Sequence, residues 1–287
     1  MSQFRNVWRA TIGAALLALL CRPAFAVGET TIVCQQGEEG GVSAVTAIDG
    51  GETLVLEDGR AVRLIGILGP KRARSGPASQ VRAQMETALS ALTLGKRIAL
   101  RLDERKRDRY GRVLAQVSVA SGGAGPVWVQ EQLVRAGLAR VISFQDSRLC
   151  VTELLAIEDE ARRTQKGLWE SGFFGVRSAA AEDLLFRLEN SYEIVEGRVS
   201  DVAEVKGRTY INFGQNWRQD FTAFIPAKSG KLFPAPAGGE AQTDGLASLK
   251  HKQVRIRGWL KNYNGPSITV THPEQIEIVD GAAAAIR

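Results

Sequence analysis

The stretch from Asp103 to Val117, D-E-R-K-R-D-R-Y-G-R-V-L-A-Q-V, carries the strongest pattern in this chain of 287 residues. A run of cations ends in D-R-Y-G-R at residues 108–112, and an apolar strand pattern begins directly afterwards. Gly111 gives the backbone the freedom that a tight turn needs. Arg112 then stands at the entrance of the strand, where its planar, permanently charged guanidinium suits phosphate oxygens. A solvated basic turn is the alternative interpretation of such a charge run.

A second pattern lies upstream in residues 47–70, A-I-D-G-G-E-T-L-V-L-E-D-G-R-A-V-R-L-I-G-I-L-G-P. It predicts a strand from Thr53 to Leu56, a turn at D-G in positions 58–59, and a returning strand from Ala61 to Ile67. Arg63 falls among the apolar residues of the returning strand. The two patterns together place one arginine inside a strand and another at the start of one.

These two stretches resemble the staphylococcal-nuclease-like (thermonuclease) family. That family shows an Asp-Gly-Asp-Thr strand, an Arg-Leu strand that ends in an acidic-Pro-Glu site, and later an Asp-Arg/Lys-Tyr-Gly-Arg turn. The resemblance covers roughly residues 42–169, with the motifs in the family's order and spacing. It implies an α+β fold, mainly β, in which a five-stranded barrel of the OB type carries three helices.

The resemblance also implies a set of phosphate-binding residues. Arg63 matches the first phosphate-binding arginine of the family, and Arg112 matches the second. Arg109 and Tyr110 belong to the same turn and are expected to contact nucleic acid. Hydrolysis of a phosphodiester passes through a dianionic transition state, which fixed positive charge stabilises.

The metal and base positions of the family fall on different residue types in this chain. Two carboxylates of the family hold Ca²⁺, and a glutamate assists the attacking water. The first metal position falls on Glu52, one residue later than usual, while Asp49 matches the preceding turn aspartate. The second falls on Leu68, which has no oxygen to offer a hard cation. The glutamate falls on Lys71, and a protonated lysine with an ordinary pKa of about 10.4 is a poor base.

Three hypotheses about function remain open. The residues favour a nuclease-fold protein that binds the phosphodiester backbone through a basic face, with weak or absent hydrolysis. The second hypothesis is a functional secreted phosphodiesterase or endonuclease with a rebuilt site, in which Glu52, Asp49 and Lys71 take new roles. The third is an envelope scaffold whose two β domains bind protein. The expected partner is nucleic acid, DNA or RNA, or another phosphate polyanion, and Ca²⁺ is implied by the resemblance alone.

The first 26 residues have the pattern of a secretory signal. Two arginines form the charged end, Ala10 to Leu20 is the apolar core, and A-F-A at 24–26 is a small-x-small cleavage site. We expect cleavage after Ala26 and a periplasmic or secreted protein without a transmembrane helix, because the apolar run is short for a bilayer. A lipoprotein modified at Cys21 is the alternative, which the bulk of Leu20 disfavours.

Cleavage there leaves two cysteines, Cys34 and Cys150. An even pair in an exported protein predicts one disulfide. Two unpaired thiols are the alternative. Zinc ligation is disfavoured because the chain has no C-x-x-C pair, and its two histidines lie far away, at His251 and His272.

Charge is concentrated in residues 60–112, which carry 14 Lys and Arg against 4 Asp and Glu, a net +10 (14 minus 4), while the whole chain is +6. A concentrated basic face attracts polyanions and accelerates their capture. We therefore favour a polyanion-binding face. A feature that only promotes solubility is the alternative.

The first domain is expected at residues 27–175. Helical periodicity predicts helices from Ser79 to Leu94, Val127 to Ala139 and Val151 to Lys166. Alternation predicts further strands from Arg97 to Leu102 and Val113 to Val119. Five strands interrupted by helices fit a small Greek-key barrel.

A helical linker at residues 176–191 is expected to lead to a second, OB-like β-barrel at 192–280, before a disordered tail at 281–287. The second domain includes a hairpin through N-G at positions 264–265. Its aromatic residues suggest a platform for stacked bases, with core packing as the favoured alternative for most of them. They are Phe213, Trp217, Phe221, Trp259 and Tyr263.

Overall fold

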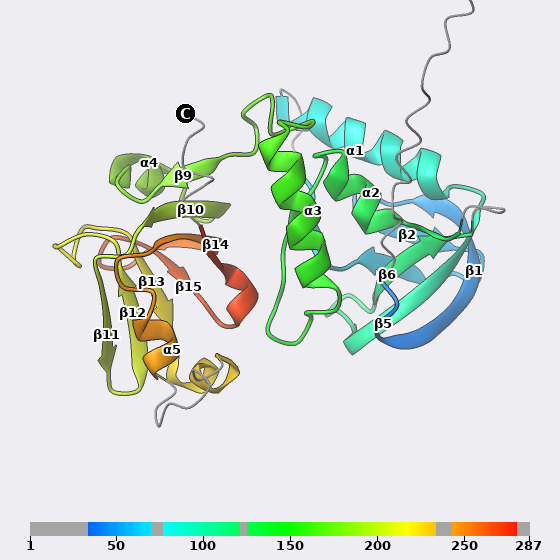
Figure 1. The fold of residues 1–287 in the computed structure, drawn as a ribbon. Helices are drawn as coiled ribbons and strands as arrows, with labels where there is room; N and C mark the ends of the chain where they lie inside the picture. Colours follow the sequence, from blue (N-terminus) through cyan, green and yellow to red (C-terminus); the bar gives the residue numbers. More distant parts are fainter. Residues whose placement is uncertain (1–33, 71–76, 121–124, 234–242, 280–287) are drawn as a thin grey trace, which may run out of the picture. The chain divides into compact units, whose positions relative to one another are not determined.

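The computed structural model describes residues 34–70, 77–120, 125–233 and 243–279. These residues belong to one compact unit of the chain. We call residues 34–175 the barrel region and residues 176–279 the C-terminal region, and Figure 1 labels their helices and strands. The expected export signal, Lys71 and the tail lie outside the described residues.

The barrel region is built on one curved sheet. Its strands are β1 (Glu38–Ile48), β2 (Thr53–Leu56), β3 (Ala61–Leu64), β5 (Arg97–Arg107), β6 (Val113–Val119) and β7 (Val127–Trp128). They run in the order β3-β2-β1-β5-β6-β7, and an additional parallel pairing of β3 with β6 closes five of them into a barrel. Two further short strands, β4 (Ile67–Leu68) and β8 (Arg140–Val141), pair with each other. The closed barrel confirms the expected fold class for this part of the chain.

Three helices pack on the barrel: α1 (Pro77–Thr93), α2 (Val129–Arg135) and α3 (Val151–Arg163). The second contacts both of the others and strand β6 (Figure 1). It starts later than expected because Val127 and Trp128 pair with the end of β6 as strand β7. The helices and the strands bury one continuous apolar core, which includes Leu54, Leu64, Leu89, Trp128, Leu133 and Leu154.

The disulfide between Cys34 and Cys150 is present, as the cysteine count predicted. It joins the start of the barrel region to the residue before α3, across 116 positions of sequence. Trp169, beyond α3, packs its ring 5.4 Å from that of Phe174 in a small separate apolar cluster. The disulfide therefore ties the start of the barrel region to the start of α3.

The described residues of the C-terminal region form eight paired strands. They are β9 (Val176–Ser178), β10 (Tyr192–Arg198), β11 (Asp201–Val205), β12 (Arg208–Asn212), β13 (Thr222–Ile225), β14 (Gln253–Asn262), β15 (Pro266–Thr269) and β16 (Ile276–Ile278). Short helical segments lie between them: α4 (Glu182–Arg187), η1 (Ala227–Leu232), α5 (Thr243–Ala247) and η2 (Pro273–Gln275). The segment expected as a linker thus contains β9 and α4. The expected hairpin is present as β14 and β15.

The prediction of a second barrel is wrong. The strands follow one another in the order β11-β12-β13-β15-β14-β10-β9, with β16 pairing on β14, and the two end strands do not pair with each other. Alternating apolar residues predict strands and their buried face, but they carry no information about whether the first and last strands meet. The sheet instead covers a core of its own that includes Val195, Phe221, Ile256, Leu260 and Ile268.

Charged side chains join the two regions. Arg257 of β14 donates to Glu158 of α3 at 2.7 Å, and both side chains are buried. The other carboxylate oxygen of Glu158 accepts the backbone N–H of Val141 at 2.6 Å. The Tyr192 hydroxyl donates to the carbonyl of Val141 at 3.0 Å. The C-terminal region is therefore held on α3 and β8 by buried side chains that form hydrogen bonds with these two elements.

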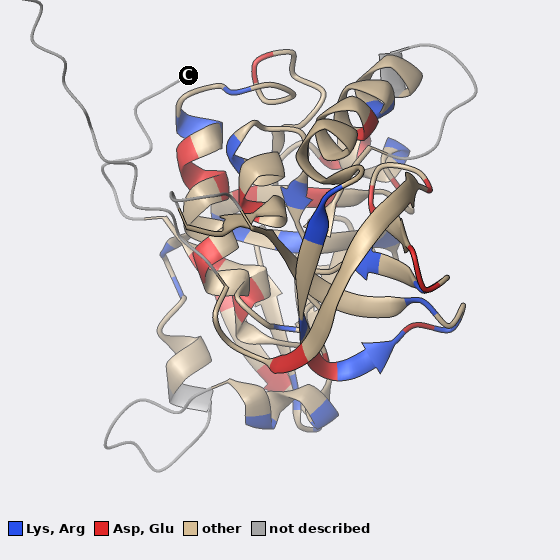
Figure 2. Cartoon of the chain, turned by 90° about the vertical axis from the view of Figure 1, so that its right-hand side faces the viewer, with Lys and Arg blue, Asp and Glu red and all other residues tan. Residues whose placement is uncertain are grey.

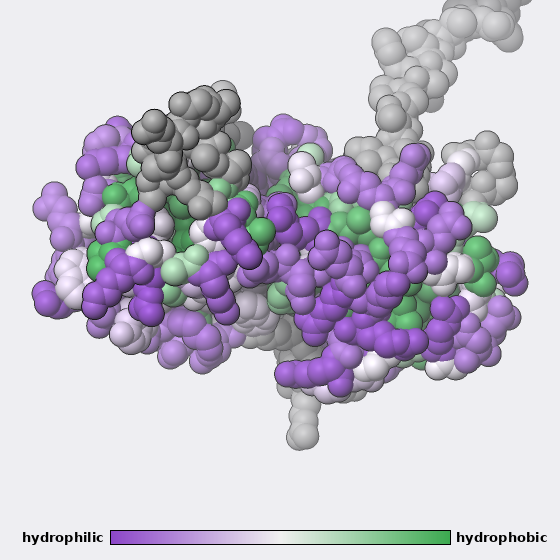
Figure 3. Space-filling model, turned by 90° about the horizontal axis from the view of Figure 1, so that it is seen from below, coloured by the Kyte–Doolittle hydropathy of each residue, from purple (hydrophilic) through white to green (hydrophobic). Residues whose placement is uncertain are grey.

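Hydrophilic side chains cover most of the face seen in Figure 3, and hydrophobic residues appear there in small separate patches. Among the described residues, no helix is both long enough and apolar enough to cross a membrane.

Candidate functional site

The closing pair of the barrel brings the two predicted arginines together. Arg63 lies in β3, and Arg112 directly precedes β6. The two strands pair in parallel, with Val62 opposite Val113 and Arg63 opposite Leu114. Both guanidinium side chains are mostly buried, with 24% and 28% of their surfaces exposed. Two residues that are about a third of the barrel region apart in sequence thus form one cationic site, which we call the arginine pair.

The turn before β6 is held by Asp108. Its carboxylate accepts the backbone N–H groups of Tyr110 at 2.9 Å and of Arg112 at 3.0 Å, together with the Arg112 side-chain Nε at 2.7 Å. Gly111 has a φ of 79°, which L residues with side chains rarely adopt. Burial disfavours the charged carboxylate, but these hydrogen bonds outweigh it and keep the pKa of Asp108 below its ordinary value.

Arg112 is also oriented by β2, because its Nη1 donates to the hydroxyl of Thr53 in that strand at 3.1 Å. Arg63 forms an ion pair with Glu52. Glu52 in turn accepts the backbone N–H of Gly69. Burial, and secondly the charge of Arg112, lower the pKa of Arg63 to about 10. Arg63 therefore remains a cation at neutral pH, with its partner carboxylate beside it.

The residues at the expected calcium site do not fit a divalent cation. A hard cation requires several oxygen ligands that converge, yet Glu52 is engaged by Arg63 and Gly69. Asp49 is exposed, and Leu68 pairs with Arg140 in the short β4–β8 ladder and supplies no side-chain oxygen. In the described part of the chain, no group of three or more His, Cys, Asp or Glu side chains is arranged to hold a metal.

The other two predicted contact residues lie on the exposed tip of the turn. Arg109 donates from Nη2 to the Tyr110 hydroxyl at 2.7 Å, and its guanidinium lies 4.8 Å from the centre of that ring. The guanidinium of Arg112 approaches the same ring at 5.4 Å. Tyr110 is 67% exposed. The exposed ring of Tyr110 thus lies between Arg109 and Arg112, at the edge of the arginine pair.

The basic segment 60–112 is less positive in space than in sequence. Figure 2 shows Asp and Glu segments beside the Lys and Arg segments, and many of the cations have a carboxylate partner within 4 Å. The paired cations are Arg60, Arg63, Arg82, Arg97, Arg101, Arg105, Lys106 and Arg112. Counting charges along the sequence missed these partners because most of them come from outside the segment or from its turns.

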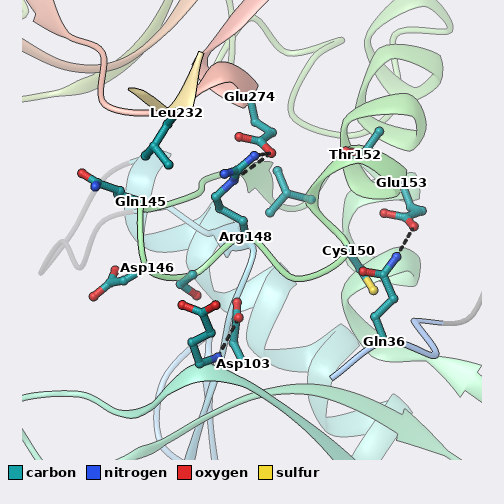
Figure 4. A pocket seen from close by; sticks show the side chains of 13 residues that line it. Gln36, Asp103, Gln145, Asp146, Arg148, Cys150, Thr152, Glu153, Leu232 and Glu274 are labelled. Atoms are coloured by element: carbon teal, nitrogen blue, oxygen red, sulfur yellow. Dashed lines mark hydrogen bonds and ion pairs between the residues drawn. The ribbon is translucent and has the colours of Figure 1, made fainter. Parts of the chain in front are cut away.

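A cavity of about 440 Å³ lies elsewhere, beside the disulfide. Figure 4 shows Arg148 reaching across it to Glu274, with the two bonded at 2.5 Å, while Asp103 and Asp146 lie on the other side of the arginine. Neither member of the arginine pair lines this cavity. Its charged lining residues are five carboxylates and one arginine, so it does not suit a polyanion. Sequence reasoning did not find it because its carboxylates are far apart in the chain.

Comparison with known proteins agrees with this geometry. The pattern of the family described as "Staphylococcal nuclease homologue" matches residues 61–171. A protein of Escherichia coli named "Protein ParB" is 34% identical over 131 residues, which are 44% of this chain and 70% of that protein. The chain belongs to the staphylococcal nuclease family. The "Thermonuclease" of Staphylococcus hyicus is 25% identical over 130 residues, covering 44% of this chain and 74% of its own length.

Membership in the staphylococcal nuclease family gives a nuclease-like function at the level of the family, with nucleic acid as the class of substrate. The matched segment runs from the start of β3 past α3 and contains Arg63 and Arg112. It ends at residue 171, before the first strand of the C-terminal region. The family match therefore gives no account of that second region.

Proposed function

We propose that this protein binds the phosphodiester backbone of nucleic acid through Arg63 and Arg112, and that it hydrolyses the polymer weakly or not at all. The observation that supports this function is the ion pair of Glu52 with Arg63. A carboxylate that is already bonded to a guanidinium and to a backbone N–H has few lone pairs left for a cation. The arginine pair can still bind phosphate oxygens, because each guanidinium presents several donors in one plane.

The missing groups affect the chemical step more than the binding step. Leu68, at the family's second metal position, cannot polarise or position a water molecule. Lys71, at the position of the assisting glutamate, is protonated at neutral pH unless its surroundings depress its pKa, and its assignment rests on the sequence. Without a base or a metal-bound water, attack on a phosphodiester loses its activated nucleophile.

Binding by the arginine pair is expected to be of moderate strength. Glu52 and Asp108 already neutralise the two guanidinium groups. A phosphate that binds must therefore compete with a carboxylate of the protein itself. Phosphate contacts release counterions, so the affinity should fall as salt concentration rises.

The deciding experiment measures cleavage and binding on the same protein. The full chain is incubated with single-stranded DNA and RNA, with Ca²⁺ and with a chelator, and binding is followed by fluorescence anisotropy. We expect no metal-dependent cleavage and salt-sensitive binding. Arg63→Gln and Arg112→Gln should each weaken binding about fivefold or more and lower the salt slope by about 1.

A matched control is Arg60→Gln, because Arg60 also pairs with a carboxylate, Asp58, but lies outside the arginine pair. This variant should bind nearly as well as the wild type. Metal-dependent cleavage that both arginine-pair variants abolish would instead identify a functional phosphodiesterase with a rebuilt site. Absence of both cleavage and binding would favour the scaffold hypothesis.

The same proposal places the protein outside the cytoplasm, in the periplasm or in the medium, with a signal removed after Ala26. The disulfide supports this location, because such bonds persist in oxidising compartments. We also propose residues 27–175 and 192–280 as separate domains, supported by their two distinct apolar cores. Mass spectrometry of the exported protein and limited proteolysis would test the two assignments.

A further inference from the structure

The C-terminal sheet has one face on its core, and the part of its other face that does not pack on α3 is toward solvent. Alternate residues of four neighbouring strands point into the core and are fully buried: Ile211, Ala223, Leu260 and Ile268. Because the side-chain period of a strand is two, the residues between them point the other way. We call the opposite surface of β12, β13, β14 and β15 the outer face. Its side chains are exposed or only partly buried, apart from Thr222 and from Arg257, which is buried against Glu158 of α3.

Aromatic residues form a row across the outer face. Tyr210 of β12 lies opposite Phe224 of β13, and their ring centres are 5.4 Å apart at an angle of 35°. Phe224 lies opposite Thr269 of β15 in the parallel pairing of those strands. The exposed guanidinium of Arg208, two residues before Tyr210 on the same face, is 6.0 Å from the centre of the Phe224 ring. Two partly exposed rings with a cation beside them therefore lie on the solvated face of the sheet.

A second row, beside the aromatic one, consists of hydrogen-bonding side chains. The pairings of the strands place these residues next to one another in the order Asp201, Asn212, Thr222, Ser267 and Lys261. Amides, hydroxyls and an ammonium group offer both donors and acceptors. The single carboxylate of the row, Asp201, is neutralised by Lys250 at 2.8 Å.

The polar row ends in a cavity of about 380 Å³ that has an aromatic wall. Asp201 and Asn212 line it together with Trp217, which is 51% exposed. The guanidinium of Arg218 lies 4.4 Å from the centre of the Trp217 ring. The cavity is therefore continuous with the outer face, and it combines an aromatic ring, a cation and an amide side chain.

The aromatic residues considered from the sequence divide between the core, which was the favoured alternative, and the surface. Phe221 is fully buried in the core, and Phe213 packs against it with ring centres 5.0 Å apart. Trp217, by contrast, is exposed at the end of the polar row. Two aromatic residues that the sequence did not single out, Tyr210 and Phe224, form the row on the sheet instead.

We propose that the outer face and its cavity bind the unpaired bases of single-stranded nucleic acid, a second contact for the polymer that the arginine pair would hold. Bases stack on aromatic side chains irrespective of sequence, and sheet faces present such rings to single strands. Tyr210, Phe224 and Trp217 supply the rings, and Asn212 supplies hydrogen bonds to the edge of a base. This inference rests on the proposed function for the class of ligand.

The charges of the face select an anionic ligand. Arg208, Arg218 and Lys261 are cations on or beside the rows, while the one acidic member is already paired. Phosphates between successive bases would lie near these cations while the bases reach the rings. A protein partner would need a larger apolar area than two partly exposed rings provide.

The experiment separates bases from phosphates. Anisotropy of the full chain is measured with fluorescein-labelled oligo-dT of 20 nucleotides and with an abasic oligomer of the same length and charge. We expect the wild type to bind oligo-dT at least fivefold more tightly than the abasic oligomer, since stacking contributes about 1–3 kcal/mol per base. Tyr210→Leu with Phe224→Leu, and separately Trp217→Ala, should reduce this preference and leave the affinity for the abasic oligomer unchanged.

Two controls keep the result interpretable. Phe144→Ala removes another exposed aromatic side chain, in the barrel region, and should preserve the preference. Thermal unfolding shows whether the double leucine variant is folded, and Trp217→Ala tests the cavity independently because that ring is exposed. Equal affinity of the wild type for the two oligomers, or a preference that survives both sets of substitutions, would overturn the proposal.

The two proposals fail in different ways. If the abasic oligomer binds and Arg63→Gln weakens it, but no preference for oligo-dT exists, the proposed function stands and the base contact falls. If the preference depends on the outer face while Arg63→Gln changes nothing, the base contact stands and the role of the arginine pair falls. If the wild type binds neither oligomer, both proposals are overturned.

Discussion

The barrel region and the C-terminal region carry their charges in different settings. In the barrel region, Arg63 and Arg112 are mostly buried and are each bonded to a carboxylate of the protein. On the outer face of the C-terminal sheet, Arg208 and Arg218 lie against aromatic rings instead. In the first setting the carboxylate orients the guanidinium group and partly neutralises its charge. In the second setting the charge remains available to a ligand, and the ring adds an apolar surface. The difference shows that the number of cations does not by itself determine the affinity for a polyanion, because a cation that is paired with a carboxylate of the protein is less available to phosphate.

The comparison also separates binding from chemistry. The family match covers Arg63 and Arg112, while Glu52, the residue that the sequence resemblance places at a metal position, forms an ion pair with Arg63. A substitution at one ligand position can convert a metal site into an ion pair, because a guanidinium satisfies the same oxygens that a divalent cation would.

The largest expected effect is a loss of stability, mainly in the barrel region. Replacing Cys34 and Cys150 by serine removes a crosslink that closes a loop of 116 positions. The chain-entropy model gives a loss of about 4–5 kcal/mol in the free energy of unfolding. Hydrogen exchange should show reduced protection throughout the barrel strands, with a smaller change in the C-terminal sheet. Equal loss in both regions would mean that they unfold as one cooperative unit.

A slightly smaller effect is expected where the two regions meet. Arg257→Met removes the hydrogen-bonded cation of the buried Glu158 and leaves it only Arg162, at 3.8 Å, and such a change costs about 3–5 kcal/mol. Urea unfolding of the variant should show this loss. Replacing Glu158 by leucine in the same chain should restore a large part of the stability, because the pair is then exchanged for apolar groups. A variant as stable as the wild type would contradict the assignment of this contact.

A third prediction concerns acid. His272 is 1% exposed, and burial lowers its pKa to about 4, with Glu274 raising it and Arg148 lowering it further. Its Nε2 accepts from the Ser143 hydroxyl at 2.6 Å if Nδ1 carries the proton toward Thr271. The unfolded chain binds this proton near pH 6.5, so the neutral histidine stabilises the fold fully above that value.

This contribution is lost as the pH falls from 6.5 toward 4, and at pH 4 the loss is about 3 kcal/mol. His272→Asn should flatten this part of the curve of unfolding free energy against pH. The comparison with the wild type removes the effect of the carboxylates, which titrate in both proteins. An identical slope in the two proteins would show that His272 is not the group responsible.

The smallest expected effect sharpens the contrast between the two settings of charge. Glu52→Gln removes the anion that competes with phosphate for Arg63. We expect the affinity for the abasic oligomer, measured with a chelator present, to increase about fivefold, which corresponds to about 1 kcal/mol. Asp201→Asn, at the edge of the outer face, is the matched control and should change the affinity less. A decrease with Glu52→Gln would show that the carboxylate orients the arginine rather than masks it.

Local patterns in the sequence predicted much of the barrel region. The turn at residues 108–112 and the apolar strand after it are present where expected, because a glycine at positive φ and an aspartate that accepts backbone N–H groups specify this turn locally. The same holds for helices α1 and α3, whose apolar periodicity is regular. Helix α2 is shorter than predicted because the pairing of Val127 and Trp128 with β6 is a contact between distant segments.

The candidate site was predicted only in part. Residue types along the chain indicated two cations and a missing metal ligand at Leu68. They did not show that Glu52 bonds to Arg63, since that contact depends on how β2 and β3 pair and where Gly69 lies. Nor did they reveal the aromatic row, because Tyr210 and Phe224 become neighbours only through the register of β12 and β13.

The sequence by itself determined the turn that presents Arg112, the positions of most strands, the disulfide partners and the kinship with the staphylococcal nucleases. These features depend on residue type and short-range spacing, which the chain displays directly. Tertiary structure alone decided that the second sheet stays open, that the basic segment is largely neutralised, and that aromatic and polar side chains gather on one face of the C-terminal sheet. Each of these features depends on the register of paired strands or on contacts between charged residues that are far apart in the sequence. Local sequence patterns do not specify such contacts.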